Sequence, residues 1–188
     1  EYLDKYLPLN DWDCFRTLYE NYSRPLPPSK LEDLIARKSV YYFRAIAEKS
    51  VMFEHASRAV KAAANRCTLA IASGARIGEI RHILTQAGLQ DFFSAIVSAE
   101  DVTEGKPHPE PFLRALDRLR EQDRPLTAAD CVAIEDSIGG IHSAHAAGMR
   151  CLAVAHSYSA SRLQSAGPEW IIESIADFEP WLEREFSK

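Results

Sequence analysis

The sequence predicts an α/β fold in which a parallel sheet is covered by helices. Helix-like and strand-like stretches alternate from about residue 51 to the end of the chain, and this alternation is typical of a parallel sheet with right-handed crossovers. Two short apolar runs, CTLAIA at 67–72 and CVAI at 131–134, each end in polar residues directly before a helix-like stretch. Ligands of open α/β sheets bind at the carboxyl ends of the strands, so these two strand ends are the first candidates for a site.

The first 48 residues are predicted to be helical and to form a unit distinct from the α/β part. One helix is expected at 11–22, and two consecutive prolines then interrupt the chain. Ser29 and Glu32 have the spacing of a capping box, which predicts a second helix running to about residue 47.

The α/β part, residues 49–188, is predicted from the period of its apolar residues. Phe112, Leu116 and Leu119 share one face of a helix at 109–121, as expected for a helix that covers a sheet. The strands are short apolar runs bounded by helix-like stretches. We expect helices at 54–65, 76–87, 109–121, 138–147 and 176–186, and strands at 67–72, 95–98, 131–135, 151–155 and 170–172.

Composition excludes two classes of partner. The formal net charge is −5 and no block of Lys and Arg occurs, whereas a nucleic-acid-binding surface is basic. No apolar run reaches the length of a membrane span. The four cysteines lack CxxC spacing, and Cys67, Cys131 and Cys151 begin predicted strands, as in a protein that keeps its thiols reduced. We therefore expect a cytoplasmic protein without nucleic-acid or membrane partners. We also expect a monomer or weak dimer.

Three polar groups follow predicted strands. Glu135 and Asp136 end one strand and supply hard oxygen ligands of the kind that Mg²⁺ prefers. Ser73 ends another strand and, with the free amides of the helix that follows, can hold an anion. Lys106 lies in a turn-forming loop, EGKPHP. Taken singly, these could be acids at a helix N-terminus, an N-cap serine and a surface lysine.

Taken together, the segments CTLAIASGA, EGKPHP and IEDSIGGIHSAHAAGM resemble the haloacid dehalogenase-like hydrolase superfamily. The resemblance is closest to its small capped phosphatases and β-phosphoglucomutase-like enzymes, and it covers nearly the whole chain. It implies a Rossmann-like parallel sheet with a helical cap at 1–48. It also implies roles: Asp136 binds Mg²⁺ and Glu135 supports the metal site, Ser73 holds the transferring phosphoryl group, and Lys106 neutralises its charge.

The resemblance further assigns groups that contact the substrate. The Gly74 amide is expected beside Ser73, and Arg76 is a candidate for binding the far end of the substrate. Asn10 and Asp11 fall where relatives carry a specificity loop. Mutase-like relatives place an arginine in that loop, and Asp11 stands there instead, which weakens the mutase interpretation.

One motif of the superfamily is absent from this sequence. The DxDxT or DxDGT run that supplies the nucleophilic aspartate does not occur, and Asp11-Trp12-Asp13 has the spacing without a preceding strand or a following Gly-Thr. In the resembled fold the strand with this motif lies at the centre of the sheet. We therefore expect a fragment that lacks its first, central strand and folds poorly when made alone. Between the Ser73 and Asp136 strands we expect either a gap or an element from elsewhere that fills it.

The predicted function is Mg²⁺-dependent hydrolysis of a small phosphorylated metabolite, of the sugar phosphate or phosphoglycolate type. The resemblance implies an aspartyl-phosphate intermediate whose aspartate lies upstream of this chain. Two alternatives stay open: a β-phosphoglucomutase-like phosphomutase, and a non-catalytic fragment or degenerate relative that binds without turnover.

Overall fold

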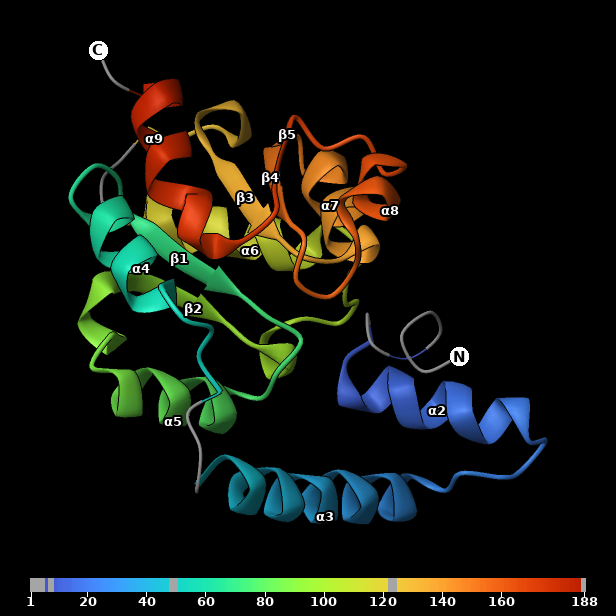
Figure 1. Ribbon diagram of the computed structural model, residues 1–188. Coiled ribbons are helices and arrows are strands. Elements are labelled where there is room, and N and C mark those ends of the chain that lie inside the picture. Colours follow the sequence, from blue (N-terminus) through green and yellow to red (C-terminus); the bar gives the residue numbers. More distant parts are fainter. Residues whose placement is uncertain (1–5, 7–8, 48–50, 122–124, 187–188) are drawn as a thin grey trace.

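The computed structural model describes residue 6 and residues 9–47, 51–121 and 125–186. Two helices are followed by an alternating α/β arrangement (Figure 1). The helices are α2 (Asp11–Asn21), α3 (Pro28–Ala47), α4 (Ala56–Ala64), α5 (Ile77–Ala87), α6 (Glu110–Arg120), α7 (Ile138–Ala146), α8 (Ala160–Gln164) and α9 (Phe178–Phe186). The strands are β1 (Leu69–Ala72), β2 (Phe93–Val97), β3 (Val132–Glu135), β4 (Arg150–Val154) and β5 (Trp170–Ile172). Short 3-10 helices lie at η1 (Gln90–Phe92), η2 (Ala99–Asp101), η3 (Ala128–Asp130) and η4 (Ile175–Asp177).

Helices α2 and α3 pack on each other beside the α/β part (Figure 1). Asn10 begins α2, because its side-chain oxygen accepts a hydrogen bond from the Asp13 amide at 2.9 Å. Helix α3 begins at Pro28 rather than after the predicted capping residue Ser29, since proline suits the first helical position. The division of the chain at residue 48 stays a prediction, and residues 1–5, 7–8 and 48–50 lie outside the described residues.

The five strands form two parallel sheets rather than one, with the orders β1-β2 and β3-β4-β5. Ala70 lies opposite Ala95 in the first sheet, and Ile134 lies opposite Leu152 in the second. Among the described residues no strand pairs with the other edge of β1 or β3. The predicted gap between these two strands is therefore present, and Ile134 in β3 is 46% exposed.

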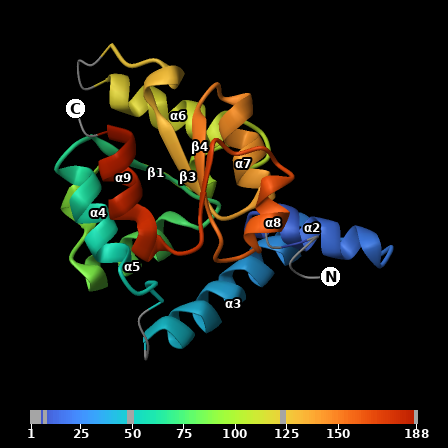
Figure 2. The ribbon, with the colours of Figure 1, turned by 45° about the horizontal axis from the view of Figure 1, so that its top comes forward.

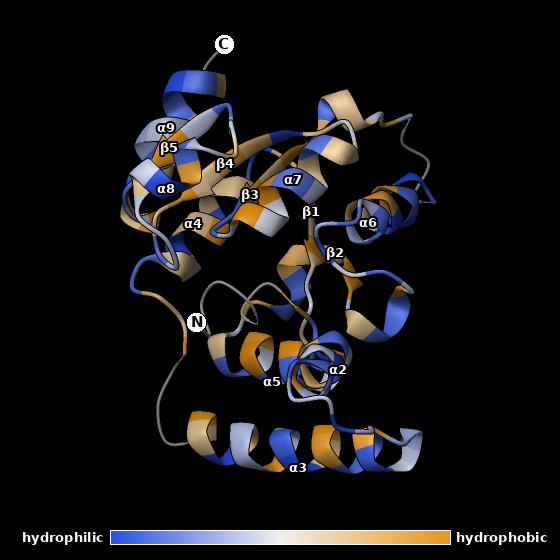
Figure 3. Cartoon of the chain, turned by 90° about the vertical axis from the view of Figure 1, so that its right-hand side faces the viewer, coloured by the Kyte–Doolittle hydropathy of each residue, from blue (hydrophilic) through white to orange (hydrophobic). Residues whose placement is uncertain are grey.

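Helices cover both faces of the strands, which carry mainly hydrophobic residues (Figures 2 and 3). Helix α4 lies beside α9 on one side, and α6 lies beside α7 on the other (Figure 2). Strand β4 has hydrophobic side chains on both faces. Cys151 and Ala153 pack in one cluster with Phe112 of α6. Leu152 and Val154 pack in the other cluster with Trp181 of α9. The alternation along one strand thus builds two cores.

The same two cores extend across the gap. Ala72 of β1 packs with the cluster of Ala133 in β3, and Leu69 of β1 packs with the cluster that Val132 of β3 also contacts. The two sheets are therefore joined by side chains without backbone pairing between β1 and β3.

Several predictions made from local pattern were incomplete. Cys67 and Cys131 were predicted to begin strands but precede β1 and β3, and Cys151 is the second residue of β4. Helix α9 begins at Phe178, two residues later than predicted, and its residues Phe178 and Trp181 are buried. Helix α8 was not predicted, because its five residues are too few to show a period. None of the described helices is long and apolar enough to cross a membrane.

Candidate active site

Ser73 directly follows β1 and is held there by the backbone. Its amide donates to the Val97 carbonyl at 2.9 Å, and its hydroxyl oxygen accepts from the Ala75 amide at 3.1 Å. The hydroxyl proton is therefore left to donate to a ligand. The Gly74 amide donates to no acceptor among the described residues. Two donors thus lie side by side at the end of β1, which suits the oxygens of an anion.

The loop that carries Lys106 is fixed at its two ends. The Glu110 carboxylate accepts from the Thr103 amide at 3.0 Å and from the Glu104 amide at 2.8 Å. These bonds, the Glu104 amide foremost, lower the pKa of Glu110. Beyond Lys106, the buried hydroxyl of Ser143 donates to the His108 carbonyl at 2.7 Å. The loop is therefore tied to its own helix and to α7.

Lys106 lies across the gap between the two sheets. Its amine donates to the Ala72 carbonyl at the end of β1 at 2.9 Å and pairs with the Glu135 carboxylate at the end of β3. The side chains of this pair are 16% and 7% exposed. A charged pair so far from water gains its stability from close, hydrogen-bonded geometry. One cation thus draws together the ends of β1 and β3.

The Glu135 carboxylate rests on the first turn of α7. It accepts from the Ser137 hydroxyl at 3.2 Å, and the Ser137 oxygen accepts from the Gly140 amide at 3.0 Å. A Cβ atom at position 140 would overlap the carboxylate of Glu135. Gly140 therefore provides the space that this acid occupies, and the Gly139-Gly140 pair in the sequence was the one signal that could have indicated it.

Asp136 points toward the loop after β4. Its carboxylate accepts from the Ser157 hydroxyl at 2.5 Å. Ser157 was not predicted as a site residue, because it lies 21 positions away in a stretch without a motif. The structure therefore places Asp136 beside Glu135 in the chain, with the two carboxylates engaged by different partners.

The donor atoms of Glu135 and Asp136 show whether these residues suit Mg²⁺. The described residues contain no cluster of three or more His, Cys, Asp or Glu side chains that could hold a metal by themselves. Mg²⁺ does not require such a cluster, since it is usually bound by one or two carboxylates together with water and substrate phosphate oxygens. The buried Glu135 and the adjacent Asp136 match that kind of donor set, and no soft ligand adjoins them in the chain.

A small cavity opens between α2 and the two strand-end loops. Its volume is about 30 Å³, which is room for one or two water molecules. Asn10 is 9% exposed and packs against Gly74 and Gly105; a Cβ atom at position 105 would lie 2.9 Å from the Asn10 amide nitrogen. The lining residues are Asn10, Ser73, Gly74, Ala99, Val102, Gly105, Lys106 and Pro111.

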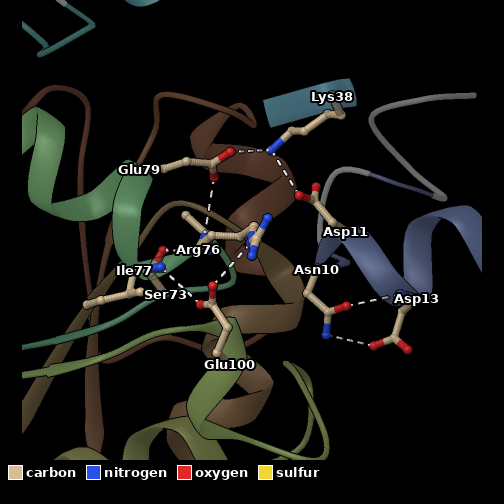
Figure 4. Close-up of polar contacts among 10 residues, drawn as sticks. Asn10, Asp11, Asp13, Lys38, Ser73, Arg76, Ile77, Glu79 and Glu100 are labelled. Atoms are coloured by element: carbon tan, nitrogen blue, oxygen red, sulfur yellow. Dashed lines mark hydrogen bonds and ion pairs between the residues drawn. The ribbon is translucent and has the colours of Figure 1, made fainter. Parts of the chain in front are cut away.

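The structure brings four of the predicted site residues to this cavity and leaves two engaged elsewhere. Asn10, Ser73, Gly74 and Lys106 line it. By contrast, the carboxylate of Asp11 pairs with the Lys38 amine at 3.1 Å, and the Arg76 guanidinium pairs with Glu100 at 3.1 Å (Figure 4). The roles of all these residues stay predictions.

A comparison with models of known protein families identifies the family of this chain. The model of the haloacid dehalogenase-like hydrolase family matches residues 1–154. The chain belongs to this family. Among the family's curated relatives, the bifunctional riboflavin kinase/FMN phosphatase of Arabidopsis thaliana is 34% identical over 106 residues, which are 51% of this chain and 26% of that protein. The phosphoglycolate phosphatase of Yersinia pestis is 27% identical over 142 residues, which are 74% of this chain and 59% of that protein.

A solved structure of another protein shows the same fold. The β-phosphoglucomutase of Clostridium difficile superposes with a TM-score of 0.82 at 17% identity, covering 97% of this chain and 79% of that one. At this identity the likeness shows the fold alone. The chain spans less than two thirds of the length of the two curated relatives, so the activity of the whole protein is a proposal.

Proposed function

We propose that the intact protein is a Mg²⁺-dependent phosphatase that hydrolyses a small phosphorylated metabolite, of the sugar phosphate or phosphoglycolate type. The observation that carries the proposal is the position of Lys106, which contacts the ends of β1 and β3 beside the open donors of Ser73 and Gly74. A phosphoryl group in this place would meet two hydrogen-bond donors and one cation. Such positioning and charge stabilisation are the main contributions of an enzyme to phosphoryl transfer.

Each site residue has a proposed role that follows from its chemistry. Ser73 and the Gly74 amide would bind non-bridging oxygens, and Lys106 would offset their negative charge. Asp136 would hold Mg²⁺ with support from Glu135, and the bound ion would supply Lewis-acid stabilisation of the phosphoryl oxygens. Because the cavity holds only one or two water molecules, Asn10 on α2 would have to withdraw for a phosphate ester to enter. None of the described residues is assigned as the nucleophile.

Phosphatase names among the curated relatives support this proposal over a mutase, although the fold is shared with a β-phosphoglucomutase. Within this chain, Arg76 is engaged by Glu100, and Asp11 at the start of α2 is an acid. A mutase handles a substrate with a second phosphate, and neither residue offers such a group an unpaired positive charge. The expected cytoplasmic location and the expected monomer or weak dimer stay predictions.

The proposal is tested with the intact protein and p-nitrophenyl phosphate. Hydrolysis should require Mg²⁺ and stop after metal removal. Asp136→Ala should lower kcat by at least about 100-fold, because charge stabilisation of the phosphoryl group is lost. Asp117→Ala on the outer face of α6 removes an exposed aspartate and should leave the rate unchanged. Full activity without metal, or normal turnover of the Asp136 variant, would overturn the proposal, and no turnover by the wild type would favour the binding-only alternative.

A further inference from the structure

The start of α5 is occupied by acids of the chain itself (Figure 4). Glu100 follows β2, and its two carboxylate oxygens accept from the Arg76 guanidinium at 3.1 Å and from the Ile77 amide at 2.9 Å. Burial alone would raise the pKa of Glu100, but these hydrogen bonds outweigh it and lower the pKa. Glu100 therefore stays ionised at neutral pH and fills the position that an anion would take at this helix end.

A second pair of acids neutralises the other cation of this region. Lys38 on α3 pairs with Asp11 at 3.1 Å and with Glu79 at 3.0 Å. The other oxygen of Glu79 accepts from the Arg76 amide at 3.3 Å, and Glu79 is only 2% exposed. Each cation that Figure 4 shows here is thus met by at least one carboxylate.

This charged region adjoins the candidate active site. Arg76 lies three positions after Ser73 in the chain, and Ala99, the neighbour of Glu100, lines the same cavity as Ser73. Asn10, the neighbour of Asp11, lines it as well. The indole of Trp12 lies over the Arg76 guanidinium, with 5.9 Å between the guanidinium carbon and the ring centre. The part of a substrate that extends from the phosphate toward α2 would therefore meet Glu100 and Arg76.

We propose that Glu100 is a specificity-determining residue that excludes substrates with a second anionic group. This inference rests on the proposed phosphatase function. Of the two substrate types named there it keeps the sugar phosphates, whose remaining part is uncharged, and excludes the phosphoglycolate type, which carries a carboxylate. A second phosphate or carboxylate would have to displace Glu100 from Arg76 and the Ile77 amide, or lie against a like charge. Juxtaposed like charges are among the strongest means of rejecting a wrong ligand.

The test compares two pairs of substrates that differ in a second anion. Glycerol 3-phosphate and 3-phosphoglycerate share a three-carbon skeleton, and glucose 6-phosphate and glucose 1,6-bisphosphate share a sugar. The intact wild type is compared with Glu100→Gln, which keeps the size of the side chain and removes its charge. The matched control is Glu179→Gln, because Glu179 forms a carboxylate–guanidinium pair with Arg58 between α4 and α9, away from the cavity.

The wild type should hydrolyse the member of each pair that lacks the second anion with a kcat/KM at least about tenfold higher. Glu100→Gln should reduce that ratio by about tenfold in at least one pair, chiefly by lowering KM for the substrate with the second anion. Adding Arg76→Gln to the Glu100 variant should abolish the improved hydrolysis of the substrate with the second anion. The control should keep the wild-type ratio. A residue that only caps α5 would change thermal stability and leave the ratios alone.

The inference is overturned if the wild type prefers the second anion in both pairs, or if Glu100→Gln leaves both ratios within twofold of the wild type. If Glu100→Gln does not fold, the wild-type ratio of kcat/KM values is measured at two salt concentrations. An electrostatic exclusion must weaken as salt screens the charge, so the ratio should fall at high salt. A constant ratio contradicts the inference. If the wild type hydrolyses none of the four compounds, the proposed function fails. The inference is then judged by binding: glucose 1,6-bisphosphate should raise the Tm of Glu100→Gln more than that of the wild type, and an equal rise overturns it.

Discussion

Gly140 shows how a single missing side chain shapes this site. The residue is helical, so alanine would fit its backbone conformation, but the added methyl group would overlap the Glu135 carboxylate. That carboxylate is the partner of Lys106. The space above Gly140 therefore decides where the acid at the end of β3 can lie, and through it where the lysine lies.

We predict that Gly140→Ala displaces Glu135 and separates it from Lys106. Forcing a methyl group into a packed site should cost about 1–3 kcal/mol of unfolding free energy, measured by urea denaturation of the intact protein, and hydrolysis should fall at least tenfold if the proposed function holds. Gly78→Ala in α5 is the matched control. A Cβ atom there would lie 3.9 Å from Phe43, so this change should be neutral or slightly stabilising. An equal effect of both substitutions would show that the Glu135 contact is unimportant.

At the scale of elements, the pair of helices α2 and α3 is attached to the α/β part by a buried charge. Lys38 on α3 reaches Glu79 on α5, and Glu79 is 2% exposed. Burial alone would lower the pKa of Lys38, but its bonds to Glu79 and Asp11 outweigh this and raise it. The Phe43 and His82 rings add an edge-to-face contact between the same two helices, with 5.4 Å between their centres.

We predict that Lys38→Met loosens α3 from α5, because it leaves Glu79 as a buried charge without its cation. Breaking such a pair typically costs about 3–5 kcal/mol, and the cost can be avoided here if α3 moves away and water reaches Glu79. Hydrogen exchange should therefore rise in α3 and in the first turn of α5 while α6 and α7 stay protected.

The double variant Lys38→Met with Glu79→Gln provides the control for this prediction. Removing the stranded charge should restore most of the protection in α3, since a neutral amide costs less to bury than an unpaired carboxylate. Equal exchange in the wild type and the single variant would show that the charge pair does not hold the helices together.

The whole molecule contains two sheets held side by side without pairing between β1 and β3 among the described residues. Unpaired inner edges are costly to bury and prone to wrong pairing when exposed. The Lys106–Glu135 pair and the shared hydrophobic clusters join the two sheets, but they do not satisfy the backbone groups along the strands.

We predict that residues 1–188, made alone, behave as a compact but loosely packed protein. They should bind the dye ANS, show far-UV circular dichroism of an α/β protein with little near-UV signal, and lack a cooperative thermal transition. A parallel strand placed between β1 and β3 should restore cooperativity by pairing both edges. A sharp transition without dye binding in the 188-residue chain would contradict this expectation.

The sequence alone determined the order of the elements and which residues stand at strand ends. Apolar runs at period two or 3.6, glycines and prolines act within a few positions, so the five strands and most helices were predicted to within a few residues. The same local reasoning placed Ser73 after β1, Lys106 in its loop and Glu135 with Asp136 at the end of β3. These are statements about neighbours in the chain.

Only the tertiary structure decided which groups meet. Lys106 and Glu135 are 29 positions apart, Lys38 and Glu79 are 41 apart, and Ser157 and Asp136 are 21 apart. Arg76, a candidate substrate-binding group in the sequence, pairs with Glu100, 24 positions away. Local pattern cannot contain these pairings, because each depends on how the sheets and helices pack. Because an unpaired buried charge is costly, packing supplies such partners from distant parts of the chain.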